Sequence, residues 1–250
     1  MLVSHEERTQ YVIKRHRELA GHSTFSASAK LRVLLIGDSY SQDFLNMIEE
    51  TGLLPDAEIR VRYVTWRCQI YIGEEDWRDF VAPKDHPLCK NVYRSDFYPS
   101  LAPLIQGADV VILAEAWVEW AARRLPDTIR KLGIPASTRI IVLGRKNFGV
   151  VARRSYLGLS WQEKVALRNR VDDSLLKINE LMNTNLQETG NVEFVDLLRL
   201  VCGESVQTCP VFSPEGKLLS HDGGHLTQAG AIHISGLLKQ HPVFQSFSKP

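Results

Sequence analysis

The chain has 250 residues, which is enough for one large domain with its own hydrophobic core. Its 30 lysines and arginines nearly balance 29 aspartates and glutamates, and 44% of its residues are hydrophobic. This balance speaks against nucleic acid or a charged membrane surface as a partner chosen by bulk electrostatics. No apolar run approaches the ~20 residues of a membrane-spanning helix, so we expect no membrane insertion.

The first 30 residues predict an extension ahead of the main domain. Residues 6–20 are charged and have a weak helical period, which indicates a peripheral helix, and residues 21–30 form a polar linker. No apolar stretch of signal-peptide length is present, which favours a cytoplasmic location. We therefore expect a helical extension and linker over 1–30 and a single domain over 31–250.

Short apolar segments alternate with helical patterns through the rest of the chain. Five segments are typical of strands: residues 31–36, 58–64, 109–114, 139–144 and 192–196. Four segments predict helices: residues 39–52, 117–132, 160–186 and 227–240. Residues 65–100 have little period and predict a long structured loop. The alternation indicates an α/β fold with a parallel sheet covered on both sides.

The segment Gly37-Asp38-Ser39 lies between the first strand and the first helix of this domain. Ligands of open α/β sheets bind beyond the strand ends, and a helix N-terminus there favours developing negative charge. Ser39 is therefore placed to attack an acyl carbon. The alternative is that Asp38 and Ser39 merely cap the helix, and this tripeptide alone favours that interpretation.

A second polar cluster, His221-Asp222-Gly223-Gly224-His225, precedes the last helix. A serine nucleophile needs a general base and a group that orients the base, and His225 and Asp222 can supply both from one turn. Two alternatives remain: a polar surface loop, or a metal site formed by His221, Asp222 and His225. The metal site would lack a fourth ligand.

Together the two motifs resemble the SGNH (GDSL) hydrolase superfamily, whose first block is G-D-S and whose last is D-x-x-H. The resemblance implies a three-layer, flavodoxin-like fold with about five parallel strands, a catalytic triad of Ser39, Asp222 and His225, and no cofactor. The segments 110–117 and 202–230 look like the SGNH domains appended to membrane acyltransferase-3 proteins, which O-acetylate bacterial surface polysaccharides.

This closer resemblance implies a serine esterase or O-acyltransferase that acts on short acyl esters, such as acetyl esters, of carbohydrates. A small-molecule or glycan ester is then the substrate, and association with a membrane acyltransferase is implied. It also favours a periplasmic or other extracytoplasmic location, in conflict with the N-terminal pattern.

The chain departs from the superfamily pattern at the oxyanion hole. Where the third block usually carries an asparagine, this chain reads Ala114-Glu115-Ala116-Trp117. Gly73 is a candidate for the second-block glycine, although it lies in the irregular loop. Arg67 and Trp117 are further candidates for substrate or oxyanion contacts, with a surface role and a core role as the respective alternatives. Trp66 and Trp120 can likewise belong either to a sugar-binding rim or to the core. Arg145, like Arg67, can either reach the site or have only a surface role.

The four cysteines do not have the spacing of a zinc site. Two interpretations stay open: four free thiols, or two local disulfides, Cys68–Cys89 and Cys202–Cys209.

Two other functions compete with catalysis. The first is a carbohydrate-binding domain that has kept the fold with weak or no activity, which the missing asparagine favours. The second is a mononucleotide-binding, flavodoxin-like protein, which the absence of a glycine-rich phosphate loop disfavours.

Overall fold

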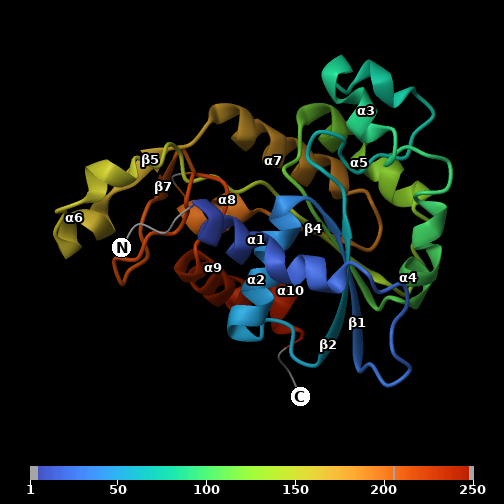
Figure 1. Cartoon of the computed structure of the whole chain (residues 1–250), viewed down its shortest axis with the longest axis horizontal. Helices are drawn as coiled ribbons and strands as arrows, with labels where there is room; N and C mark the ends of the chain where they lie inside the picture. Colours follow the sequence, from blue (N-terminus) through green and yellow to red (C-terminus); the bar gives the residue numbers. More distant parts are fainter. Residues whose placement is uncertain (1–4, 205, 248–250) are drawn as a thin grey trace.

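A five-stranded parallel sheet forms the centre of the molecule (Figure 1). The computed structural model describes residues 5–204 and 206–247. The strand order is β2-β1-β3-β4-β6, and every neighbouring pair is parallel. The strands are β1 (Leu31–Gly37), β2 (Ala57–Tyr63), β3 (Val110–Ala114), β4 (Arg139–Leu143) and β6 (Val192–Val195). The five expected strands are therefore present, and the predicted α/β fold is confirmed.

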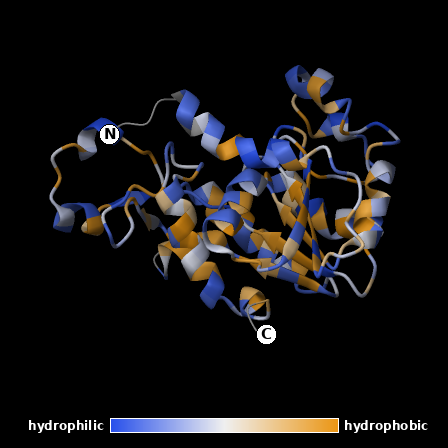
Figure 2. Cartoon of the chain, turned by 60° about the horizontal axis from the view of Figure 1, so that its bottom comes forward, coloured by the Kyte–Doolittle hydropathy of each residue, from blue (hydrophilic) through white to orange (hydrophobic). Residues whose placement is uncertain are grey.

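The central strands are apolar because both of their faces are covered. Every residue of β3 is buried, as are Val33 to Gly37 of β1. Figure 2 shows these strands as a hydrophobic centre within more hydrophilic helices and loops. Gly37 pairs with Tyr63 on one side and Ala114 on the other, so three strands end at the same edge. This edge is where an open α/β sheet binds its ligands.

Helices cover the sheet on both sides. Helix α2 packs against α1 and α9, whereas α5 packs against α7 (Figure 1). The long helices are α1 (His5–Leu19), α2 (Ser39–Thr51), α5 (Glu119–Lys131), α7 (Asp173–Leu186) and α9 (Gln228–Gln240). Shorter helices join them: α3 (His86–Cys89), α4 (Ala102–Gly107), α8 (Leu197–Cys202) and α10 (Pro242–Gln245). Gly52 ends α2 in the left-handed conformation, as the sequence predicts.

The prediction of a single helix over 160–186 is wrong. The segment contains helix α6 (Trp161–Ala166), strand β5 (Arg168–Arg170) and then α7. The capping box between Ser160 and Glu163 is present, but α6 ends after six residues because β5 pairs antiparallel with β7 (Thr208–Pro210). Asp172 then begins a new helix by accepting a hydrogen bond from the Ser174 N–H.

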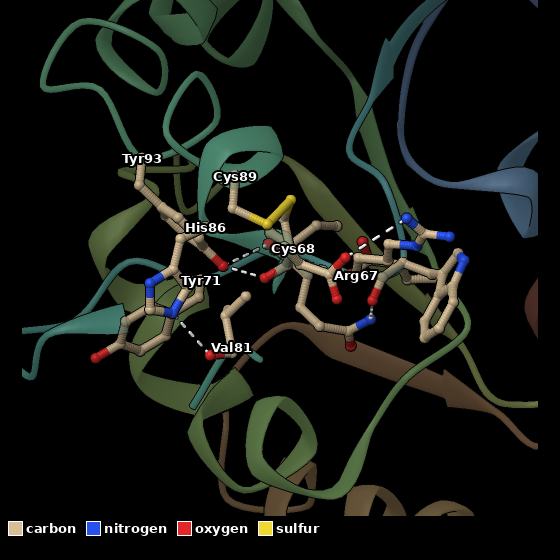
Figure 3. Close-up of a disulfide and its surroundings, with 12 residues drawn as sticks. Arg67, Cys68, Tyr71, Val81, His86, Cys89 and Tyr93 are labelled. Atoms are coloured by element: carbon tan, nitrogen blue, oxygen red, sulfur yellow. Dashed lines mark hydrogen bonds and ion pairs between the residues drawn. A yellow bond between two sulfur atoms is a disulfide. The ribbon is translucent and has the colours of Figure 1, made fainter. Parts of the chain in front are cut away.

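Two disulfides cross-link segments of the chain that lie outside the five-stranded sheet. Cys68 is joined to Cys89 and Cys202 to Cys209, with Cα–Cα distances of 5.2 and 4.4 Å. Of the two interpretations of the cysteines, the structure therefore has the disulfides. Figure 3 shows the first of them packed beside Tyr93 and His86.

The expected loop 65–100 is a chain of short helical turns. It contains α3 and the 3-10 turns η1 (Trp77–Asp79), η2 (Pro83–Asp85) and η3 (Pro99–Leu101). The Tyr93 hydroxyl donates to the Cys68 carbonyl, so this segment is closed by a hydrogen bond as well as by the disulfide (Figure 3).

In the two described ranges, none of the helices is long and apolar enough to cross a bilayer.

Candidate active site

A pocket of about 330 Å³ at the carboxyl edge of the sheet contains all three residues of the predicted triad. Ser39 reaches it from α2, and Asp222 and His225 reach it from the loop before α9. Its other lining residues are Thr9, Val12, Ile13, Gln42, Tyr63 and Trp66. The fold thus brings together a serine and an Asp/His pair that are more than 180 residues apart in the sequence.

Ser39 is the first residue of α2, and its position depends on the two residues before it. A Cβ on Gly37 would lie 1.8 Å from the Ala114 carbonyl oxygen, so only glycine permits this close approach of β1 to β3. Asp38 is the N-cap, and its carboxylate accepts hydrogen bonds from the N–H groups of Tyr40 (2.8 Å) and Ala116 (2.9 Å). Capping therefore belongs to Asp38.

The Ser39 backbone N–H accordingly remains available for a ligand. In the part of the chain that the structure describes, no group accepts a hydrogen bond from it. It belongs to the first turn of α2, where the free N–H groups and the helix dipole favour an anion. This backbone group is suited to hold an oxyanion formed at a carbon that Ser39 attacks.

Two buried carboxyl groups, those of Asp38 and Glu115, lie at the ends of β1 and β3 next to Ser39. Burial raises the pKa of Asp38 to about 6, although its two backbone hydrogen bonds and the positive charges of Lys146 and Arg145 oppose the rise. Burial raises the pKa of Glu115 well above its usual range, and the nearby Asp38 charge adds to this. One Glu115 oxygen accepts a hydrogen bond from the Ile70 N–H at 2.8 Å. Glu115 thus connects β3 to the loop after β2.

His225 and Asp222 have the geometry of a base and its orienting group. His225 Nδ1 lies 2.8 Å from Asp222 Oδ2, while Asp222 Oδ1 accepts the backbone N–H groups of Gly224 and His225. With Nδ1 protonated and donating to Asp222, the lone pair of Nε2 is free to accept a proton. The pair is therefore held in one orientation by three hydrogen bonds within four residues.

The same contacts shift both pKa values. The hydrogen bond with Asp222 raises the pKa of His225, and the Asp43 charge adds to the rise against burial and the Lys146 charge. Burial by itself raises the pKa of Asp222, but the hydrogen bonds from the His225 side chain and from the His225 and Gly224 backbone outweigh it. The net result is an Asp222 pKa well below its usual range.

A buried ion pair joins α2 to the segment after β4, and the same carboxylate is hydrogen-bonded to the loop that carries His225. Asp43 of α2 lies 2.7 Å from Lys146, and both side chains are almost completely buried. Asp43 also accepts the Leu226 N–H at 3.2 Å, which fixes the residue that follows His225. Lys146 Nζ lies 3.4 Å from the centre of the Tyr40 ring, and the Tyr40 hydroxyl donates to the Lys146 carbonyl.

Gln42 is a site residue that the sequence interpretation missed. It lies one helical turn after Ser39, lines the same pocket and is only 7% exposed. Among the described residues, none hydrogen-bonds its side-chain amide. An amide in this position can replace the asparagine donor that the β3 end lacks. Its spacing of three from Ser39, which puts both on one helix face, was the available signal.

Helix α1 forms part of the pocket wall. The sequence predicted a peripheral helix, and a helix is present, but Thr9, Val12 and Ile13 line the pocket. Val12 and His16 are buried, and burial lowers the pKa of His16 to about 4.

The structure does not bring the three tentative contact residues into this pocket. Gly73 lines a separate pocket with Tyr71 and Trp77. Trp117 is completely buried and donates from Nε1 to the Leu143 carbonyl at 2.9 Å, which is a core role. Arg67 lies 3.5 Å from Asp85 and above the Trp66 ring.

The remaining aromatic and basic candidates divide between the pocket and the protein body. Trp66 lines the pocket and is 50% exposed. Trp120 stacks on Phe80. Arg145 donates to the Trp117 carbonyl and lies over Tyr40.

Asp222 also lines a second, more open groove of about 780 Å³. Arg153, Arg170 and His221 are among its other residues. Within the described ranges no cluster of three or more histidines, cysteines or acidic residues could hold a metal ion. The metal-site alternative for His221, Asp222 and His225 thus gains no support.

Three solved structures of bacterial proteins are similar to this chain. A putative platelet activating factor from Streptococcus pneumoniae has 18% identity and a TM-score of 0.51, with 94% of this chain and 93% of that chain covered. A GDSL-like lipase from Bacteroides thetaiotaomicron has 14% identity and a TM-score of 0.47, covering 93% and 97%. The C-terminal catalytic domain of peptidoglycan O-acetyltransferase A (OatA) from Streptococcus pneumoniae has 14% identity and a TM-score of 0.42, covering 88% and 96%.

The sequence itself matches a family. No curated protein matches the chain. The model of the family described as "SGNH domain (fused to AT3 domains)" matches residues 6–240, which is most of the chain and includes α1. This chain therefore belongs to the family of SGNH domains that are fused to AT3 domains, and it is an enzyme of the SGNH ester-hydrolase or acyltransferase type.

Proposed function

We propose that the domain hydrolyses or transfers short acyl groups, such as acetyl, on carbohydrates through Ser39, His225 and Asp222. The observation that carries the proposal is the shared pocket: Ser39 at the start of α2 and the hydrogen-bonded His225–Asp222 pair line the same space. Membership of the AT3-fused family supports an acyl-transfer role. The class of substrate rests on the resemblance of segments 110–117 and 202–230 to SGNH domains of proteins that O-acetylate surface polysaccharides.

In the first step Ser39 Oγ attacks the acyl carbonyl carbon and its proton passes to His225 Nε2. The carbonyl electrons move onto oxygen, and the Ser39 N–H and the Gln42 amide stabilise this oxyanion. Asp222 remains ionised and stabilises the imidazolium. The tetrahedral intermediate then collapses, and the leaving alkoxide takes the proton from His225, which leaves an acyl ester on Ser39.

The second step repeats this chemistry with a new nucleophile. His225 removes a proton from water or from a sugar hydroxyl, whose oxygen attacks the acyl carbon, and Ser39 leaves with the proton returned to it. Water gives hydrolysis and a sugar hydroxyl gives transfer. Trp66, half exposed at the pocket mouth, presents an aromatic surface against which a pyranose ring can pack.

Trapping the acyl-enzyme position tests the proposal directly. We expect a fluorophosphonate to label the wild-type protein once, with the added mass on the peptide that contains Ser39. The Ser39→Ala variant should remain unlabelled, whereas the matched Ser41→Ala variant, whose hydroxyl is bonded to the Asp38 carbonyl, should still be labelled. A folded wild-type protein that is never labelled, or is labelled elsewhere, overturns the catalytic assignment.

The non-catalytic alternative rests on the β3 end, where the Ala116 N–H is already bonded to Asp38 and no asparagine is present. It predicts glycan binding without turnover. Titration of acetylated and deacetylated oligosaccharides into wild-type and Ser39→Ala protein separates the two cases. Equal binding to both proteins, with no acetate released by the wild type, selects the binding domain.

We also propose that the domain works beside a membrane acyltransferase on the outer side of the cytoplasmic membrane. The AT3-fused family and the two disulfides support this location. Titration of thiols in denatured protein prepared from whole cells, with alkylation before lysis, provides the test. The mass of the denatured protein then counts the alkyl groups that were added. Absence of added groups agrees with the proposal, and four added groups, one on each cysteine, contradict it.

A further inference from the structure

Residues 150–170 form a projection, here called the arm, which carries η4 (Arg153–Tyr156), α6 and β5. In Figure 1 its helix α6 lies at the end of the molecule farthest from α3 and α4, outside the layers that enclose the sheet. The arm leaves the body after Gly149, and a Cβ there would lie 2.4 Å from the Arg170 carbonyl oxygen. Its two ends therefore meet at the body.

The arm is held in a defined shape. At its base the Asn169 amide donates to the carbonyls of Phe148 (3.0 Å) and Val150 (2.8 Å). Strand β5 pairs with β7, whose Cys209 is bonded to Cys202. The Trp161 ring packs beside Gly216. The arm is therefore a built element of the fold.

Its surface is unusually apolar for an exposed segment. Among the described residues, eight large hydrophobic side chains are exposed, and four of them lie on the arm. These are Val150, Leu157, Trp161 and Val165, with exposed fractions of 84, 68, 57 and 36%. Trp161 and Val165 are four apart on α6 and so share one face of the helix. A concentration of this kind marks an interaction site.

The charge of the arm identifies the partner. It carries five basic residues and one acidic residue, whereas the whole chain has a net charge of +1, so the remainder is net negative. The basic residues are Arg153, Arg154, Lys164, Arg168 and Arg170, and the acidic one is Glu163. Only Arg170 pairs with a carboxylate, Asp173, among the described residues. Exposed apolar and aromatic side chains among unpaired cations are complementary to an anionic lipid surface.

We propose that the arm docks the domain on an anionic phospholipid bilayer. Leu157 and Trp161 enter the headgroup region, and Arg153, Arg154 and Lys164 contact the lipid phosphates. Arg153 and Arg170 also line the groove that reaches Asp222. Docking through the arm therefore places this groove, which Asp222 also lines, next to the membrane surface.

Vesicle sedimentation with the full chain tests the proposal, and it is independent of catalysis. We expect binding to vesicles of phosphatidylcholine and phosphatidylglycerol, weak binding to phosphatidylcholine alone, and release by added salt. Leu157→Ser should weaken binding about fivefold. Leu88→Ser, which changes a leucine exposed on α3, should have no effect.

Reversal of two positive charges on the arm provides a second test. Arg153→Glu/Arg154→Glu should weaken binding at least about 30-fold, because about 5-fold is expected for each basic residue near an anionic surface. The matched Lys84→Glu/Lys90→Glu variant makes the same change of charge on exposed residues near α3. All substituted side chains lie at the surface, and thermal melting verifies that each variant is folded. Absence of binding to the anionic vesicles, or equal loss in the matched variants, overturns the proposal.

Discussion

The two halves of the proposed triad are held in different ways. Ser39 follows a strand that is buried on both faces, and its position is fixed by the Gly37–Ala114 contact and the buried Asp38 cap. His225 and Asp222 lie on a loop, and their side chains are 38 and 42% exposed. The nucleophile is thus positioned by the core, whereas the base is positioned by three local hydrogen bonds. Changes near Ser39 should therefore lower stability most, whereas changes at the base should lower activity most.

Asp43 is the point where the two regions meet. It belongs to the nucleophile helix, forms the buried ion pair with Lys146 and accepts the Leu226 N–H next to His225. Asp43 therefore fixes the loop that carries His225 relative to helix α2. The predictions that test this division begin with the largest expected effect.

Removal of the base should abolish activity and leave the fold intact. We expect His225→Ala to lower kcat by about 10⁴-fold or more, since a triad histidine acts as both base and acid. The melting temperature should change little because the side chain is partly exposed. Ester turnover and thermal melting measure the two effects. A variant that keeps most of its activity would remove His225 from the mechanism.

Removal of the buried cation should instead cost stability. Lys146→Met leaves the Asp43 carboxylate buried without its partner, and we expect the free energy of unfolding to fall by about 3–5 kcal/mol. Urea unfolding measures this change. Lys131→Met, which removes the exposed partner of Glu74, should cost about 0–1 kcal/mol. The double variant Asp43→Leu/Lys146→Met should be less destabilised than the sum of its single changes; additive losses would contradict the pairing.

The amide of Gln42 tests whether the oxyanion hole is completed from α2. Gln42→Ala should lower kcat by about 10²–10³-fold with little change in KM, as expected for a contact made in the transition state. Gln228→Ala, an exposed glutamine on α9, should behave as wild type. Saturation kinetics with a short-chain ester separate kcat from KM. A change confined to KM would make Gln42 a binding residue only.

The smallest effect is a shift in pH dependence. His225 must be neutral to accept a proton, so kcat/KM should rise with pH through its pKa, which the bond with Asp222 holds above the usual value of about 6.5. Asp222→Asn should move this limb to lower pH and also reduce the maximum rate. A limb that does not move in Asp222→Asn would show that Asp222 does not set the pKa of His225.

The free energy of unfolding should also depend on pH through His225 and Asp222, in opposite directions for the two residues. Because the pKa of His225 is raised in the folded protein, its contribution is present below the unfolded value and lost as pH rises through the folded pKa. Because the pKa of Asp222 is lowered, its contribution is present above the unfolded value and lost as pH falls through the folded pKa. Melting curves of wild type and His225→Ala across this range measure the difference.

The sequence predicted the parts of the fold that depend on continuous burial. Strands β1 and β3 were predicted because each is a short continuous apolar segment, and β2 was predicted because its apolar and charged residues alternate. Strand β5 was missed because Arg168-Asn169-Arg170 has no apolar alternation, and it exists only through pairing with β7. Helix α7 was joined to α6 for the same reason, since the break between them is made by a distant segment.

The candidate site was predicted in the same uneven way. Ser39, Asp222 and His225 belong to short motifs that are visible in one dimension. Gln42 belongs to no motif, although it lies one turn from Ser39 on the same helix. The α1 residues also belong to no motif, and their proximity to Ser39 depends on the packing of α1 against α2. For Trp117 the sequence left a substrate contact and a core role open, and the structure has the core role.

Asp222 is reachable from two sides, because it lines both the pocket of Ser39 and the groove beside the arm. A charged group bound in the groove acts on the carboxylate that sets the pKa of His225. A cation there weakens the hold of Asp222 on the imidazolium and makes His225 a weaker base, whereas an anion strengthens it. By linkage, protonation of His225 changes the affinity of the groove for that ligand by the same factor. Occupancy of the groove can therefore regulate the strength of the base without any movement of the chain.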